Sequence, residues 1–295
     1  MYKRQAEITA KMVKELREAT GAGMMECKKA LTEAEGVFEK AVDVLRTHGL
    51  AKAAKKAGRA TNEGRVNVAV CKNDARKGAV VEINCETDFV ALTDKFQDYC
   101  DTFTRAVVHN DPATVDELLE SEYEGEKVGD TLTEAIHIIG ENMQISNFKR
   151  LEIEGTGALV PYIHMNGRIG VLVGFTFGNE ATATDERFLA MGKDVAMQIA
   201  ATNPVSLDKD SVPEDIREHE FEIYKAQAAE SGKPENIQEK IATGRMEKFY
   251  KENCLVEQDF VKDPDTTVGA YIAKCAKEIG DDIKVVSFAR IELGE

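Results

Sequence analysis

The sequence predicts an α+β protein built around an internal repeat. Two stretches rich in β-branched residues, GAVVEINC at 78–85 and GRIGVLVGF at 167–175, have the composition of buried strands. Each is followed by apolar residues at the helical spacing i, i+3, i+7 and i+11. These residues are Phe96, Tyr99, Phe103 and Val107 in the first copy, and Phe188, Met191, Val195 and Ile199 in the second. Both copies close on a similar segment, IGENMQISNFKRLEI at 139–153 and IGDDIKVVSFARIEL at 279–293.

Three short helices are expected ahead of the repeat. EITAKMVKELREAT (7–20) places Ile8, Met12, Leu16 and Ala19 on one helical face, and glycines follow it. MMECKKALTEA and VFEKAVDVLRTHG are the second and third helical patterns. Helices this short and this close together form a compact bundle, which we place at 1–54. The basic stretch that follows predicts a linker at 55–64, either solvated or in electrostatic contact with a partner.

The two copies differ in length by one insertion. Their helical patterns are offset by 92 residues and their closing segments by 140, so the second copy holds about 48 extra residues. The extra segment reads as two polar helices around SGKP, with Ile216, Ile223, Ile237 and Ile241 as a sparse apolar seam. We therefore expect an antiparallel helical hairpin at 206–254. The core subdomains are then 65–153 for the first copy, and 154–205 with 255–295 for the second.

The passage from strand to helix in the first copy has unusual residues for a turn. Turns favour Gly, Asn, Asp and Pro, yet Thr87-Asp88-Phe89-Val90 contains a large aromatic beside a carboxylate. The second copy uses GNEATATDE at 178–186, with no aromatic residue. Phe89 is therefore an addition to the fold rather than a requirement of it. Thr93 and Asp94 are expected to cap the helix that carries Phe96.

Composition and charge favour a soluble protein with protein partners. The chain has 295 residues, with 38 basic and 53 acidic side chains and a formal net charge of −15. Phosphate contacts need clustered cations, so the balance argues against direct nucleic-acid binding by the whole chain. There is no apolar run long enough to span a membrane and no signal-peptide pattern, so we expect a cytoplasmic location. The six cysteines are scattered, as is typical of buried thiols in a reducing cytosol.

Motifs for bond chemistry are missing. The sequence contains no phosphate-binding glycine loop, no His-Glu-x-x-His and no Gly-x-Ser-x-Gly. A thiol enzyme would have to use Cys85 with His164, although an inward strand position makes Cys85 a packing residue. Glu86, Asp88 and Asp94 could be drawn as a metal site, but capping and turn formation explain them better. We expect no cofactor and no metal.

Four long motifs, in order, resemble the translation elongation factor Ts family. They are VKELREATGAGMMECKKAL (13–31), NCETDFV (84–90), YIHMNGRIGVLV (162–173) and SGKPENIQEKIATGRMEKFY (231–250). The resemblance covers nearly the whole chain. It implies that 1–54 is a UBA-like domain and that the hairpin is a coiled coil. Some members of the family carry an extra C-terminal helical module, whereas this sequence stops just after the second closing segment.

The resemblance also implies a partner and a mechanism. Members of the family are guanine-nucleotide exchange factors for the translational GTPase EF-Tu, and catalyse no bond chemistry. It implies that Asp88 and Phe89 enter the G domain of EF-Tu near the magnesium and phosphate site, so that GDP leaves and GTP can reload. A complex of higher order with EF-Tu stays open. The partner-binding residues that it implies are Thr87, Asp88, Phe89, Val90, Arg17, Met24, Met25, Ile139, Gly140, His164, Val261 and Lys262.

Other interpretations remain open from the residues alone. The chain could be a noncatalytic adaptor that binds a protein through its N-terminal helices and hairpin, although an adaptor has no special use for Phe89. Met24 or Met25 could close the core of the small bundle. Gly140 is echoed by Gly280, which favours a helix cap required by the fold. A lone histidine such as His164 is often structural.

Overall fold

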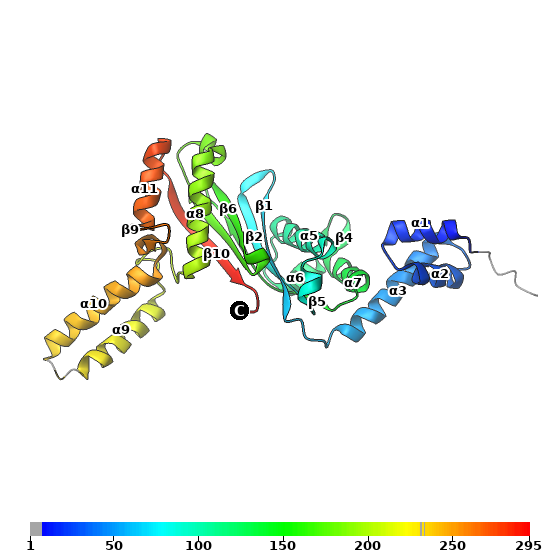
Figure 1. Ribbon diagram of the computed structural model, residues 1–295, viewed down its shortest axis with the longest axis horizontal. Helices are drawn as coiled ribbons and strands as arrows, with labels where there is room; N and C mark the ends of the chain where they lie inside the picture. The colour runs from blue at the N-terminus through cyan, green and yellow to red at the C-terminus, as the bar shows by residue number, and fades with distance from the viewer. Residues whose placement is uncertain (1–7, 231, 233) are drawn as a thin grey trace, which may run out of the picture. The chain divides into compact units, whose positions relative to one another are not determined.

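The computed structural model describes residues 8–230, 232 and 234–295, and its chain divides into two compact units (Figure 1). Of the described residues, those in 8–67, 81–148 and 293–295 form unit 1, and those in 68–80 and 149–292 form unit 2. Both contain helices and strands, so the fold is mixed and consistent with the α+β class. The units divide within strands of the first repeat, so the domain boundaries expected from sequence stay predictions.

Three helices begin the described chain: α1 (Ala10–Thr20), α2 (Met24–Glu33) and α3 (Phe38–Lys56). Thr9 caps α1 through its side chain, and Gly21 ends it in the left-handed conformation (φ 66°) that glycine adopts at little cost. Leu16 is fully buried and Ile8 and Met12 pack around the same core. Ala19 is exposed, contrary to the expected face, and Val13 is buried in its stead.

Helix α3 continues past this small bundle and packs on α7 (Val128–Ile139) of the same unit. Gly49 faces the His137 side chain across this contact, at a distance where an added Cβ would make an ordinary van der Waals contact of 3.6 Å. The ammonium of Lys56 donates to the carbonyl of Ile136 at 3.1 Å. Polar and close-packed contacts together therefore fix the end of α3 against α7.

The first repeat runs from the β1 strand to the β5 strand. Its elements, besides α7, are β1 (Glu63–Cys71), β2 (Asp74–Cys85), α4 (Asp88–Ala91), α5 (Asp94–Asn110), α6 (Val115–Glu120), β3 (Glu122–Tyr123), β4 (Glu126–Lys127) and β5 (Met143–Glu152). The sheet has the order β1-β2-β5. Thr93 caps α5 by accepting from the N–H of Phe96, which confirms the cap expected from sequence. The four apolar residues predicted for its inner face are all buried.

The second repeat follows the same element order. Its elements are β6 (Gly157–His164), η1 (Met165–Gly167), β7 (Ile169–Thr176), η2 (Glu180–Thr184), α8 (Glu186–Thr202), η3 (Leu255–Glu257), β8 (Asp259–Phe260), β9 (Asp263–Thr267), α11 (Val268–Ile279) and β10 (Lys284–Glu292). Its sheet has the order β10-β7-β6, with both neighbouring pairs antiparallel. The position of β10 beside β7 matches that of β5 beside β2, so the sequence repeat is also a repeat of topology.

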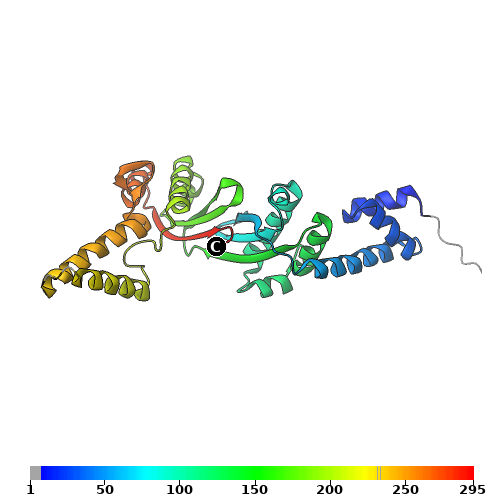
Figure 2. The same ribbon diagram turned by 60° about the horizontal axis from the view of Figure 1, so that its bottom comes forward.

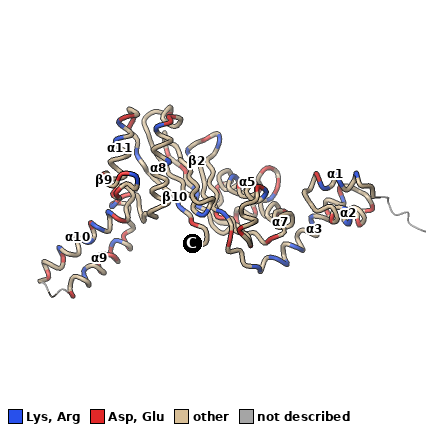
Figure 3. Tube along the Cα trace, viewed as in Figure 1, with Lys and Arg blue, Asp and Glu red and all other residues tan. Residues whose placement is uncertain are grey.

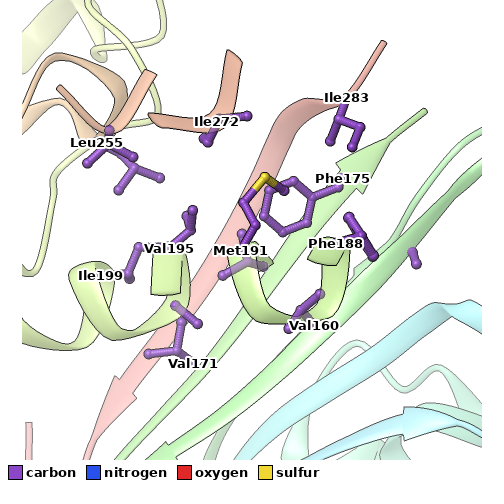
Figure 4. Packing of buried hydrophobic residues seen from close by; sticks show 14 of the residues in the cluster. Val160, Val171, Phe175, Phe188, Met191, Val195, Ile199, Leu255, Ile272 and Ile283 are labelled. Atoms are coloured by element: carbon purple, nitrogen blue, oxygen red, sulfur yellow. The ribbon is translucent and has the colours of Figure 1, made fainter. Parts of the chain in front are cut away.

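Aliphatic and aromatic side chains together fill the core of the second repeat between its sheet and α8 (Figure 4). Phe188 on α8 lies edge-on to Phe175 on β7, with ring centroids 5.5 Å apart. Met191, Val195 and Ile199 extend the same buried face along α8, as the period predicted. This packing holds α8 against the sheet.

Two helices, α9 (Glu214–Ala229) and α10 (Glu235–Asn253), form the inserted segment and lie side by side in Figures 1 and 2. The most buried residues on them are Ala228, Ala242, Met246 and Phe249, whereas the four isoleucines expected as the seam are half-buried. The buried residues of α9 and α10 therefore include both small side chains and large ones. Ser231 and Lys233 of the expected SGKP turn lie outside the described residues.

The ends of the inserted segment meet at one point of unit 2. Ser206 and Cys254 form a parallel β-bridge, and the N–H of Val205 donates to the carbonyl of Asn253 at 2.8 Å. Both helices carry acidic and basic residues, and on α9 the acidic ones are more frequent (Figure 3). Within the described ranges, no helix is both long and apolar enough to cross a bilayer.

The core of the second repeat is testable by comparing adjacent residues on α8. Phe188→Ala should lower the free energy of unfolding by about 3–5 kcal/mol, because it empties a site that the sheet cannot collapse to fill. Leu189→Ala removes a side chain that is 45% exposed and should change it by no more than about 0.5 kcal/mol. Urea titration followed by circular dichroism measures both. Equal midpoints for the two variants would contradict the packing described here.

Candidate partner-binding surface

The Thr87–Val90 stretch forms one turn of helix rather than an open turn. Thr87 is the N-cap, and its hydroxyl accepts from the N–H of Val90 at 3.4 Å. Asp88 begins α4, and the next residue, Phe89, exposes 81% of its surface. A phenyl ring left this far outside the core is available to a partner, since burying it would remove apolar surface from water.

A second apolar side chain stands close to Phe89 in the sequence. Leu92, three residues later at the C-cap of α4, is 61% exposed, while Ala91 between them is buried. Residues three apart lie on the same side of a helical turn. Sequence reasoning missed Leu92, although its spacing from Phe89 was a usable signal.

Three hydrogen bonds attach the start of this turn to Glu141. One oxygen of the Glu141 carboxylate accepts from the N–H of Glu86 at 3.1 Å and from the N–H of Thr87 at 3.0 Å. The other oxygen accepts from the hydroxyl of Thr87 at 2.7 Å. Glu141 follows the end of α7, so the turn is anchored to an element 54 residues further along the chain.

A reciprocal contact supports the same junction. The carboxylate of Glu86 accepts from the N–H of Asn142 at 2.6 Å and from the guanidinium of Arg59 at 3.2 Å. The Asn142 amide in turn donates to the carbonyl of Arg59 at 2.9 Å. The Asn142 N–H, and then Arg59, hold the pKa of Glu86 below its usual range. The segment before β1 is thus joined to the base of the turn.

The N-terminal helices of unit 1 present Arg17, Met24 and Met25. Arg17 is exposed on α1, and the two methionines open α2 with 57% and 66% of their surfaces exposed. Neither methionine belongs to the core of the small bundle, so the interpretation that one of them closes it is wrong. Flexible, polarizable side chains on a surface suit contact with another protein.

Ile139 and Gly140 lie at the end of α7. Ile139 is half-buried, and Gly140 is a C-cap with φ 89° whose N–H donates to the carbonyl of Ile136 at 3.2 Å. Gly280 has the same role after α11, with φ 86°. The fold therefore accounts for glycine at both positions, whatever else Gly140 contacts.

Unit 2 carries the other three predicted residues. His164 ends β6, and its Nδ1 is hydrogen-bonded to the hydroxyl of Tyr162 at 2.9 Å. Val261 is 49% exposed between β8 and β9, and the adjacent Lys262 pairs with Asp194 at 2.6 Å. The twelve predicted residues are therefore divided between the two units, with nine in unit 1 and three in unit 2.

The thiol expected to be inert is indeed enclosed. Cys85 is fully buried at the end of β2, and its Sγ donates to the carbonyl of Thr87 at 3.2 Å. Burial, followed by the negative charge of Glu141, raises the pKa of the Cys85 thiol to about 12. In the part of the chain that the structure describes, no three His, Cys, Asp or Glu side chains gather as a metal-ligand set.

Comparisons with known proteins agree on one family. The family model described as "Elongation factor TS" matches residues 86–295. A protein named Elongation factor Ts from Clostridium botulinum (strain ATCC 19397 / Type A) is 48% identical over 291 residues, which is 98% of this chain and 93% of the relative. The protein of the same name from Clostridium kluyveri (strain ATCC 8527 / DSM 555 / NBRC 12016 / NCIMB 10680 / K1) is also 48% identical over 291 residues, with the same coverage of both chains.

The enclosure of Cys85 predicts an order of thiol labelling. With iodoacetamide at about pH 8, half-exposed Cys71 should be alkylated first and Cys85 should stay unmodified in the folded chain. Peptide mass spectrometry measures both sites, and labelling in urea, where both should react, is the control. Rapid alkylation of Cys85 under native conditions would revive the thiol-enzyme interpretation.

Proposed function

Because the chain belongs to the elongation factor Ts family of translation factors, we propose that it binds EF-Tu and accelerates the release of GDP. The observation that carries the proposal is Phe89, 81% exposed on a turn whose backbone is fixed by Glu141. Asp88 and Phe89 then enter the G domain near the magnesium and phosphate site. GTP reloads the emptied site.

Phe89 acts in this proposal as a wedge in the partner, and the free energy of its burial can be estimated. Burying one phenyl ring in a partner contributes on the order of 2 kcal/mol. That is sufficient to favour a conformation of the partner that holds GDP weakly, without making the complex permanent. The coupling is reciprocal, since a factor that weakens GDP binding is itself weakened by GDP to the same extent. No bond is made or broken, so the proposal needs no catalytic residue and no cofactor.

The remaining surface residues supply binding. In this proposal α1–α3 form a UBA-like domain, and Arg17, Met24 and Met25 contact the G domain. Val261 and Lys262 of unit 2 contact it as well. Ile139, Gly140 and His164 meet the last domain of EF-Tu. Helices α9 and α10 form a coiled-coil hairpin with a secondary role, and the protein acts in the cytoplasm.

The test is release of a fluorescent GDP analogue from purified EF-Tu. The chain should accelerate release, and Phe89→Ala should lower the maximal stimulation roughly thirtyfold, which corresponds to about 2 kcal/mol. Leu189→Ala, which also removes an exposed apolar side chain, is the matched control and should stimulate normally. Circular dichroism checks that both variants are folded.

Two results would count against the proposal. Binding of EF-Tu by the unmodified chain without faster release would favour the adaptor instead. Full stimulation by a folded Phe89→Ala chain would place the wedge elsewhere, while leaving exchange itself intact.

A further inference from the structure

We propose that Glu141 is a positioning residue for Phe89: its carboxylate holds the start of α4 so that the phenyl ring points outward in one direction. The inference rests on the proposed function, because it assigns a role in that function. Glu141 does not touch the partner in this proposal. It acts through the Thr87–Phe89 segment.

Three hydrogen bonds join the Glu141 carboxylate to the two residues that precede Asp88 and Phe89. Both of its carboxylate oxygens are used, on the N–H of Glu86, the N–H of Thr87 and the hydroxyl of Thr87. Thr87 precedes Phe89 by two residues and also caps α4. One side chain therefore fixes both the backbone and the capping hydroxyl from which the exposed turn begins.

Helix α4 needs such an anchor. It has only four residues, and a single helical turn is not stable by itself, because nucleation fixes several dihedral angles for one hydrogen bond. The Phe89 ring makes little contact that could hold it, since 81% of its surface is exposed. An unanchored turn would have to be ordered on binding, which weakens the effect of the contact.

The second repeat contains the same device without the aromatic residue. Asp281 follows Gly280 as Glu141 follows Gly140. Its carboxylate accepts from the N–H of Gly178 at 2.9 Å, the N–H of Asn179 at 3.1 Å and the hydroxyl of Thr182 at 2.6 Å. Both repeats thus fasten the strand-to-helix passage with one carboxylate, two N–H groups and one threonine hydroxyl.

This correspondence supplies a matched pair of variants. Glu141→Ala removes three hydrogen bonds, whereas Asp281→Ala removes the corresponding three and a fourth, which its carboxylate accepts from the N–H of Asp282 at 2.8 Å, so its structural cost should be at least as large. Only the first loosens a segment that bears Phe89. The Glu86–Asn142 contact remains in Glu141→Ala and keeps the end of β2 attached.

The experiment measures release of fluorescent GDP from EF-Tu over a range of chain concentrations. Glu141→Ala should lower the maximal stimulation about tenfold while changing the half-saturating concentration less than about twofold, because the other surface contacts persist. Asp281→Ala should leave both values near those of the unmodified chain. Glu141→Gln should recover most of the loss, since its amide oxygen can accept from the two N–H groups and its NH₂ can donate to Thr87.

A double-variant comparison separates positioning from general damage. If Glu141 acts through Phe89, adding Glu141→Ala to Phe89→Ala should reduce stimulation no further. A further loss, or an equal loss in Asp281→Ala, would overturn the inference. Normal stimulation by a folded Glu141→Ala chain would also overturn it, while loss of stimulation in Phe89→Ala would leave the exchange proposal standing. Absence of stimulation by the unmodified chain would defeat the exchange proposal itself.

Discussion

Each repeat depends on the hydrogen bonds accepted by one carboxylate, which stands one residue after a glycine in the left-handed conformation. Gly140 and Gly280 end a helix and turn the chain, and the next side chain reaches the N–H groups left open where a strand passes into a helix. Those N–H groups have no strand or helix partner of their own, so without an acceptor they would need water. The carboxylate thereby joins the strand-to-helix passage to the helix that precedes the last strand of the sheet.

In the first repeat this junction reconciles two opposed demands. In the proposed function Phe89 must be exposed to reach its partner, and an exposed apolar side chain is poorly held by its own contacts. Hydrogen bonds at the start of the turn meet both demands, because Glu141, Glu86 and Asn142 fix the backbone while Phe89 stays 81% exposed. The backbone of the turn is therefore held by polar groups, while the phenyl ring of Phe89 is left exposed. The second repeat has the same carboxylate junction but no aromatic residue in its turn, so the junction does not depend on an aromatic residue such as Phe89.

Much of the fold could be predicted from sequence because it leaves a periodic or local trace. The buried faces of α5 and α8, the Thr93 cap and the repeated closing strand all follow from spacing within a few residues. Ala19 was misassigned because alanine is too small to mark a face, and Val13 took its place. On α10 the buried contact includes Met246 and Phe249, where a search for isoleucines alone was too narrow.

The candidate site was predictable only in part. Phe89 stood out because it is unlike its neighbours, and its exposure agrees with that expectation. The hydrogen bonds of Glu141 could not be predicted, since they join it to Glu86 and Thr87, which lie 55 and 54 positions away, and leave no periodic pattern in the sequence. Leu92 was overlooked because a lone leucine at the end of a short turn resembles a core residue. Long-range contacts between a side chain and a backbone need coordinates to be recognised.

The pairing of Ser206 with Cys254 has a consequence for how this chain can change. The helices α9 and α10 leave the second repeat and return to it at neighbouring points, which are joined by this bridge and by backbone hydrogen bonds of Val205, Leu255 and Val256, so no strand of the sheet runs through them. Whole helical turns can be gained or lost there in matched pairs, one from each helix, without altering the register of any strand. A change in the length of α9 and α10 would therefore alter the reach of this arm and leave the strands of the repeat in register.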